Sequence, residues 1–74
     1  MARRWIKSLT ARTVLVHTRD SRTLRGALVG VHDDCLVLDH AAYVIDDTTT
    51  DLAGRAVVPR ENVSFVQELI EVAR

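Results

Sequence analysis

The distribution of apolar residues along the chain predicts five β-strands of uneven length. Apolar and β-branched runs, which are typical of strands, lie at residues 13–18, 23–32, 35–45, 55–58 and 63–67. Polar, turn-forming residues separate these runs at 19–22, 33–34, 46–54 and 59–62. Gly26 and Gly30 fall inside the second run, where glycine marks a bend or a close approach of two backbones. Short links and a curving strand together predict a small, strongly bent antiparallel β-barrel.

The first ten residues have a different pattern, which predicts a short helix. Within residues 2–9, Trp5, Ile6 and Leu9 fall on one side and basic residues on the other. Two helical turns are not stable alone, so this helix has to dock on another surface. We therefore expect a single domain over residues 1–74, with a helix at 1–10, a barrel at 11–68 and a tail at 69–74.

Length and composition favour a small globular protein that associates with itself. The 74 residues are 47% hydrophobic with a net charge of zero, which excludes a disordered chain. No apolar run is long enough to span a membrane, and no signal peptide is recognisable, so we expect a cytoplasmic protein. Cys35 is the only cysteine and cannot form an internal disulfide. So small a core stabilises the fold by only about 3–5 kcal/mol. With no internal disulfide and no structural zinc site, we expect self-association to supply the remaining stability.

Charge is segregated along the chain despite the zero balance. Residues 1–25 contain seven basic residues and one acidic residue, whereas residues 26–54 contain six aspartates and no base. The basic segment could contact phosphates, or it could pair with the acidic segment within or between subunits. We favour pairing, because a dedicated nucleic-acid module is usually basic overall.

The motifs on the predicted strands resemble the Sm/LSm family, which includes the bacterial RNA chaperone Hfq. The first motif is the stretch Thr-Leu-Arg-Gly-Ala-Leu-Val-Gly-Val at 23–31, followed by Leu-Val-Leu-Asp at 36–39. The second is Val-Val-Pro-Arg-Glu-Asn-Val at 57–63. The resemblance implies an N-terminal helix and a bent five-stranded barrel. It also implies homo-oligomeric rings, in which the fourth strand of one subunit pairs with the fifth strand of the next.

The resemblance also implies where the functional residues lie. It puts the subunit interface on the last two strands, at Ala56, Val57, Val58, Val63, Phe65 and Val66. It puts a candidate RNA or pore site at Arg60, Asn62 and Asp33. Arg60 could meet RNA phosphate or a protein partner there, or it could pair with Glu61 or with an aspartate of a neighbouring subunit.

Two features depart from the family's RNA pocket. The family has an aspartate, an aromatic residue or histidine, and an asparagine between its second and third strands. Here that loop is His-Asp-Asp-Cys at 32–35, about one residue short and without asparagine. The second motif carries Pro-Arg at 59–60 where Arg-Gly or Lys-Gly is usual. RNA binding is therefore predicted to be weak and to depend mainly on phosphate contacts.

Enzymatic and metal chemistry have little support in the sequence. His32, Cys35 and His40 could be proposed as zinc ligands, but they need not converge and no fourth ligand is evident. The adjacent pairs at 33–34 and 46–47 are aspartates, and neighbouring residues of an extended chain point to opposite sides. We expect no catalytic residue, no metal and no cofactor.

Two functions follow from these observations. The first is a non-enzymatic, ring-forming structural or assembly subunit, plausibly of a phage or prophage particle, because the C-terminal motif is also similar to small proteins in structural gene clusters of actinobacterial phages. Its partners would be other copies and other assembly proteins, and it would dock through Arg3, Arg4, Trp5 and Lys7, unless Trp5 packs on its own barrel. The alternative is an Hfq-like RNA-binding ring, and a regulatory or adaptor module is a third possibility. No membrane partner is expected.

Overall fold

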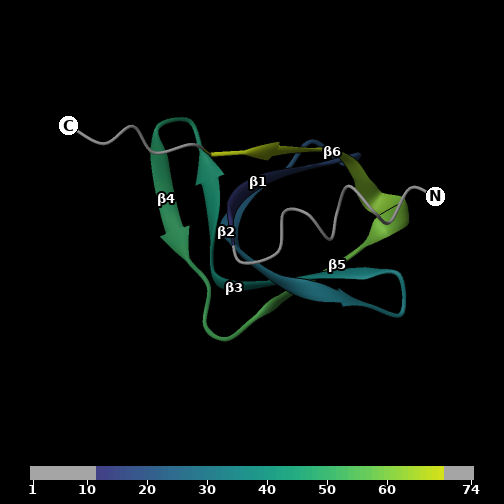
Figure 1. Cartoon of the computed structure of the whole chain (residues 1–74). Coiled ribbons are helices and arrows are strands. Elements are labelled where there is room, and N and C mark those ends of the chain that lie inside the picture. The colour runs from purple at the N-terminus through teal and green to yellow at the C-terminus, as the bar shows by residue number, and fades with distance from the viewer. Residues whose placement is uncertain (1–11, 70–74) are drawn as a thin grey trace.

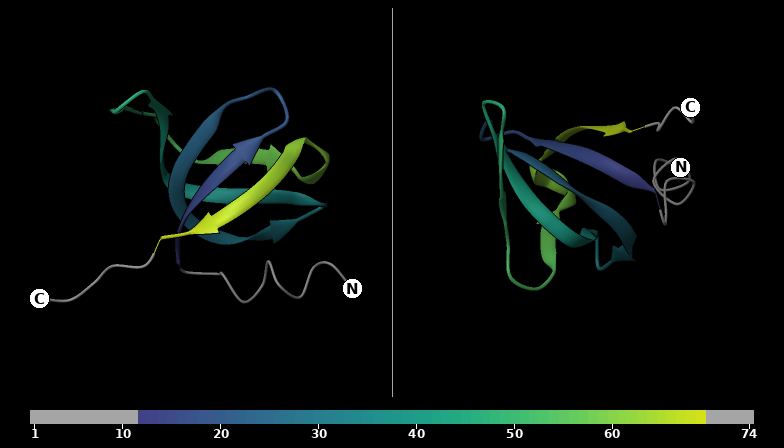
Figure 2. Two further views of the ribbon diagram at one scale, coloured as in Figure 1. Left: turned by 90° about the horizontal axis from the view of Figure 1, so that it is seen from above. Right: turned by 90° about the vertical axis from the view of Figure 1, so that its left-hand side faces the viewer.

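The computed structural model describes residues 12–69, which form one curved antiparallel sheet of six strands. In chain order the elements are β1 (Thr13–Thr18), β2 (Thr23–His32), β3 (Cys35–Ile45), β4 (Thr48–Asp51), β5 (Ala56–Pro59), the single-turn 3-10 helix η1 (Arg60–Asn62) and β6 (Val63–Glu68). The sheet order is β4-β3-β2-β1-β6, and β5 also pairs with β3. The sheet curls so that β5 and β6, which η1 connects, lie across from each other (Figures 1 and 2). This architecture confirms the predicted class, a mainly-β, bent antiparallel fold.

The strand predictions are correct for β1, β2 and β3, and the prediction of a loop over 46–54 is wrong. Within that segment, Thr48–Asp51 forms β4 and pairs with the end of β3. All four residues of β4 are exposed, so no apolar alternation marks the strand, although threonine favours it. The last two strands begin or end one residue later than predicted. The predicted helix at 1–10 and all of the tail beyond residue 69 lie outside the described residues.

Two irregularities of register bend the long strands β2 and β3. Between Arg25 and Ala27 the pairing skips one residue on β3, and between Leu28 and Gly30 it skips one on β2. Such bulges increase local twist and turn a flat sheet toward a barrel. Gly26 lies at the first bulge, where a β-carbon would be only 3.0 Å from a backbone oxygen of β3.

The core lies on the concave face of the sheet. Alternate residues of β1 and β2 point inward, as the period of two requires. The buried cluster is formed by aliphatic residues of β1, β2, β3 and β5, namely Val14, Val16, Leu24, Leu28, Leu36, Leu38, Ala41 and Val58.

The strand β5 leaves one edge unpaired within the described chain, and its hydrogen-bond pattern can be assigned. The backbone N–H of Arg60 donates to the carbonyl of Asp34 at 2.8 Å, so the facing residues Cys35 and Pro59 do not bond to each other. Pairs alternate along an antiparallel ladder, so Val57 occupies the same kind of position two residues earlier. Its N–H and C=O therefore point away from β3, toward the open edge.

Candidate nucleic-acid interface

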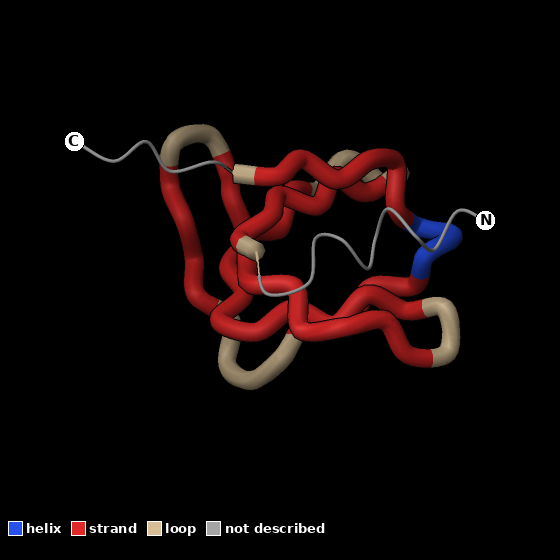
Figure 3. Tube along the Cα trace, in the orientation of Figure 1, coloured by secondary structure: helices blue, strands red, loops and turns tan. Residues whose placement is uncertain are grey.

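Three chain connections meet at one end of the barrel. They are the β1–β2 turn, the β2–β3 turn and η1 between β5 and β6 (Figures 1 and 3). Two backbone hydrogen bonds hold η1 between the turns: Arg60 N–H to Asp34 C=O at 2.8 Å, and Arg19 N–H to Asn62 C=O at 2.8 Å. The backbone of η1 is therefore held in place by hydrogen bonds to the turns on both of its sides.

The β2–β3 turn has two residues, which is the shortest common length for a hairpin turn. His32 pairs directly with Cys35, which leaves only Asp33 and Asp34 in the turn. Both have positive φ, at 50° and 58°, as a type I′ turn requires, and Asp tolerates this region better than most residues. Two exposed aspartates therefore form the tip of the turn, and no asparagine is present there.

Arg60 begins η1 directly after Pro59, and its side chain is half-buried. Its Nε is buried and has no hydrogen-bond partner within residues 12–69. Arg60 and Asp33 line one hollow, so the structure brings together two of the three residues predicted for the pore site. Asn62 lines a separate cleft beside Tyr43, so Arg60 and Asn62, which are two positions apart in the motif, do not share a hollow.

The residues predicted for the subunit interface differ in their exposure. Val57 of β5 and Phe65 of β6 are the two large apolar side chains exposed on these strands, at 59% and 53%. Val58 is 4% exposed and belongs to the core, so its side chain is not available to a neighbouring copy. Phe65 stacks on His17, with ring centroids 4.1 Å apart. The remaining three predicted residues, Ala56, Val63 and Val66, are half-buried.

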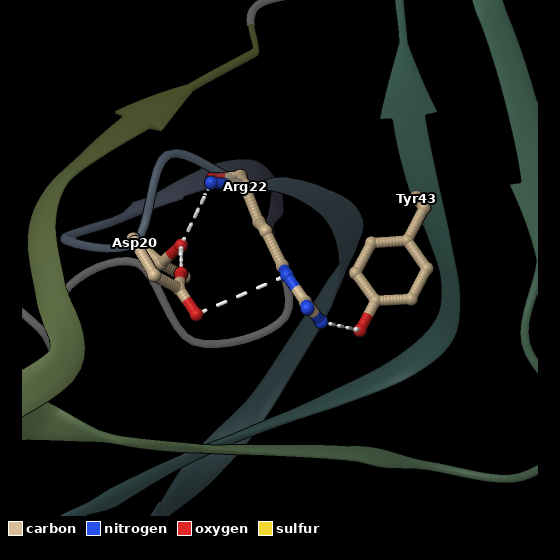
Figure 4. Close-up of polar contacts among 4 residues, drawn as sticks. Asp20, Arg22 and Tyr43 are labelled. Atoms are coloured by element: carbon tan, nitrogen blue, oxygen red, sulfur yellow. Dashed lines mark hydrogen bonds and ion pairs between the residues drawn. The ribbon is translucent and has the colours of Figure 1, made fainter.

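A polar cluster on the β1–β2 turn was not predicted from the sequence. The hydroxyl of Thr18 accepts a hydrogen bond from Arg22 N–H at 3.0 Å and also contacts Asp20. Figure 4 shows the Arg22 side chain between Asp20 and Tyr43, donating to the tyrosine hydroxyl at 3.3 Å. This cluster ties the turn to β3. Arg22 and Tyr43 are 21 positions apart, and nothing in the local sequence signals their contact.

Three ion pairs are formed among residues 12–69. Arg12 pairs with Glu68 at 2.7 Å, Arg22 with Asp20 at 3.8 Å, and Arg55 with Asp39 at 4.0 Å. None of these three pairs joins a base of residues 1–25 to an acid of residues 26–54.

Residues 12–69 contain neither a metal-ligand cluster nor a membrane-spanning helix, and the predicted docking surface lies outside them. Within residues 12–69 there is no group of three or more potential metal ligands, and no helix there is long and apolar enough to cross a membrane. The docking residues predicted on the helix, Arg3, Arg4, Trp5 and Lys7, lie outside the described residues.

A bent antiparallel barrel with a short final pair of strands linked by a 3-10 turn is the architecture of Sm-like proteins, and the chain belongs to the Sm/LSm family. The family profile of the LSM domain matches residues 4–68. No curated protein sequence is significantly similar to the chain.

Solved structures agree with this assignment. A heptameric archaeal Sm protein is 31% identical, with a TM-score of 0.80 over 90% of this chain and 98% of that one. The SmAP1 heptamer of P. aerophilum is 30% identical, with a TM-score of 0.81 over 92% of both chains. The Sm protein of Pyrococcus abyssii, solved in complex with a uridine heptamer, shares the fold at 24% identity, with a TM-score of 0.78 over 89% of this chain and 94% of that one.

Proposed function

We propose that this protein is a non-enzymatic ring protein that binds single-stranded RNA. Its membership of the LSM family over residues 4–68 is the observation that carries the proposal. Two of its relatives at 30% identity or more are heptamers. The comparisons give no support to a structural component of a phage particle, which the sequence alone had ranked first, and they favour the RNA-binding alternative.

The ring forms when β5 of one copy pairs with β6 of the next. Both strands have an open edge within the described chain, and open edges invite pairing with another chain. The outward N–H and C=O of Val57 supply hydrogen bonds along this edge, while the exposed side chains of Val57 and Phe65 supply apolar contact. Ring closure covers both edges, which an isolated barrel of this size leaves open.

The RNA contact is made by Arg60 at the end of the barrel where the three connections meet. A guanidinium group can donate two parallel hydrogen bonds to a phosphate, and the Arg60 side chain forms no ion pair within residues 12–69. The ring repeats this arginine once per copy, so that weak single contacts add up along one RNA strand. Because the turn carries aspartate at both positions and no asparagine, base selectivity is low and phosphate contacts dominate.

Filter binding to oligouridine tests this proposal, with the Pyrococcus abyssii complex as the reason for the first choice of probe. The wild-type protein should bind at physiological salt and release the RNA as salt rises. Arg60→Gln should weaken binding by about tenfold. Arg55→Gln is the matched control, because Arg55 is exposed and already contacts Asp39; it should change the affinity little.

Failure can take two forms. If the wild-type protein forms a ring but retains no oligouridine or oligoadenine, the RNA function is wrong. If Arg60→Gln and Arg55→Gln have equal effects, Arg60 is not the contact.

A further inference from the structure

Arg60 and Glu61 stand between two hollows of opposite charge. We call the first the carboxylate hollow; besides Arg60 and Glu61 it is lined by Asp33, Asp34, Cys35 and Pro59. We call the second the arginine hollow; Arg60 and Glu61 share its lining with Arg19, Ser64 and apolar residues of β3 and β6. Because Arg60 and Glu61 line both hollows, the two differ in the aspartates that line the first and in Arg19, which lines only the second.

Arg19 has the properties of a ligand-binding cation. Its backbone N–H is fixed to Asn62 C=O at 2.8 Å, so the side chain starts from a fixed point beside η1. Arg12, Arg22 and Arg55 each form an ion pair, whereas Arg19 forms none within residues 12–69. Its charge is therefore not compensated by a carboxylate of the described chain.

Arg60 contributes a second cation. Its side chain is half-buried in the lining of the same hollow, and it forms no ion pair within residues 12–69. Ser64 also lines the same hollow, and a serine hydroxyl can donate a hydrogen bond. Two guanidinium groups and a hydroxyl around one hollow match the acceptor oxygens of a phosphate.

We propose that the RNA phosphate is bound between Arg19 and Arg60 in the arginine hollow, and not on the side of Asp33 and Asp34. This inference rests on the proposed RNA function. It adds Arg19 as a second phosphate contact and places the RNA on the side of η1 that faces the arginine hollow. Phosphate is repelled by Asp33, which lines only the carboxylate hollow, so the RNA backbone lies on the side of Arg60 that faces the arginine hollow. The β1–β2 turn thereby becomes part of the binding surface.

This site is compatible with ring formation. The apolar part of the arginine hollow includes Val63, Phe65 and Val66 of β6, the strand that pairs with the neighbouring copy in the proposed ring. The two guanidinium groups instead belong to the β1–β2 turn and to η1, at the end of that strand. A neighbouring copy can cover the apolar part while the arginines remain at its border.

Fluorescence anisotropy with labelled oligouridine tests the inference on the full chain. Arg19→Gln should weaken binding by about fivefold to tenfold and make the salt dependence of log Kd shallower. Arg25→Gln is the matched control, because Arg25 is exposed on β2, has no ion pair within residues 12–69 and lies in neither hollow; it should change Kd by less than about twofold. Asp33→Asn should leave Kd unchanged or lower it, since it removes a repelling charge.

Each contrary result has its own meaning. Equal effects of Arg19→Gln and Arg25→Gln overturn the inference, and so does a large loss of affinity in Asp33→Asn, which would assign the RNA to the carboxylate hollow. Arg19→Lys, which keeps the charge but loses the bidentate geometry, should fall between the wild type and Arg19→Gln. If the wild-type protein binds no RNA while its ring is intact, the proposed function itself fails.

Discussion

Gly26 is the position where one added methyl group tests the bent barrel most sharply. A β-carbon at Gly26 would lie 3.0 Å from the backbone oxygen of Asp39, 3.2 Å from Cβ of Leu38 and 3.3 Å from Cα of Ala41. Two of these atoms are backbone atoms of β3, so they cannot move without shifting the bulge. Gly26→Ala therefore forces β2 and β3 apart at the point where they bend.

The magnitude follows from two opposing terms. Overpacking of this kind costs about 1–3 kcal/mol, and the loss of glycine's freedom in the unfolded chain returns about 0.4–1 kcal/mol. Gly26→Ala should therefore lower the free energy of unfolding by about 1–2 kcal/mol. Gly30 is the matched control, because a β-carbon there meets nothing closer than His32 Nε2 at 3.6 Å. Gly30→Ala should be neutral or stabilise by up to about 1 kcal/mol.

Urea unfolding followed by far-ultraviolet circular dichroism measures both variants. The protein concentration must be equal in all samples, because dissociation of an oligomer makes the apparent stability depend on concentration. Gly26→Ala should unfold at a lower urea concentration than the wild type, and Gly30→Ala at an equal or higher one. If Gly26→Ala is as stable as Gly30→Ala, the close approach of β2 and β3 is wrong.

Three further predictions follow from the edges, turns and surface pairs. Val57→Pro should give folded monomers by sedimentation, because it removes an N–H that points away from β3. Val58→Pro should unfold the protein, because it removes an N–H bonded to β3. If the Val57→Pro variant forms the same oligomer as the wild type, β5 is excluded as the interface. Gly54→Ala should lower the free energy of unfolding by about 1–2 kcal/mol in urea titrations, because Gly54 has a φ of +79°; Gly54→Asn should lose less, and an unchanged alanine variant would refute the turn. Arg12→Gln should cost less than about 1 kcal/mol in the same assay, since exposed ion pairs contribute little and the Arg12 side chain is 63% exposed; a larger loss would show that this pair clamps β6.

The sequence predicted the parts of the fold in which one face is buried. The alternation of apolar residues defines β1 and β2, and the two-residue turn at Asp33 and Asp34 follows from the polar break between long apolar runs. β4 was missed because Thr48–Asp51 is exposed throughout, so its pairing with β3 leaves no apolar signature. The pairing of an exposed edge strand such as β4 depends on the distant strand that lies beside it, and the local sequence pattern carries no information about that strand.

The candidate site was predictable only in part, for a related reason. Arg60 and Asp33 belong to motifs that are recognisable in the sequence, and the register between β3 and β5 brings them together. The proposed role of Arg19 could not be predicted, because it depends on a backbone hydrogen bond to Asn62, 43 positions later in the chain. Zero net charge also pointed away from RNA, although charge in the folded chain is sorted locally into two hollows.

Sedimentation velocity of the full chain with fluorescently labelled oligouridine at physiological salt tests the central claim most directly, because it reports assembly and binding together. The account predicts that the RNA sediments with a ring of several copies and that Arg60→Gln leaves the ring intact but binds the RNA about tenfold more weakly. A folded monomer, or an intact wild-type ring from which the RNA sediments separately, would contradict it.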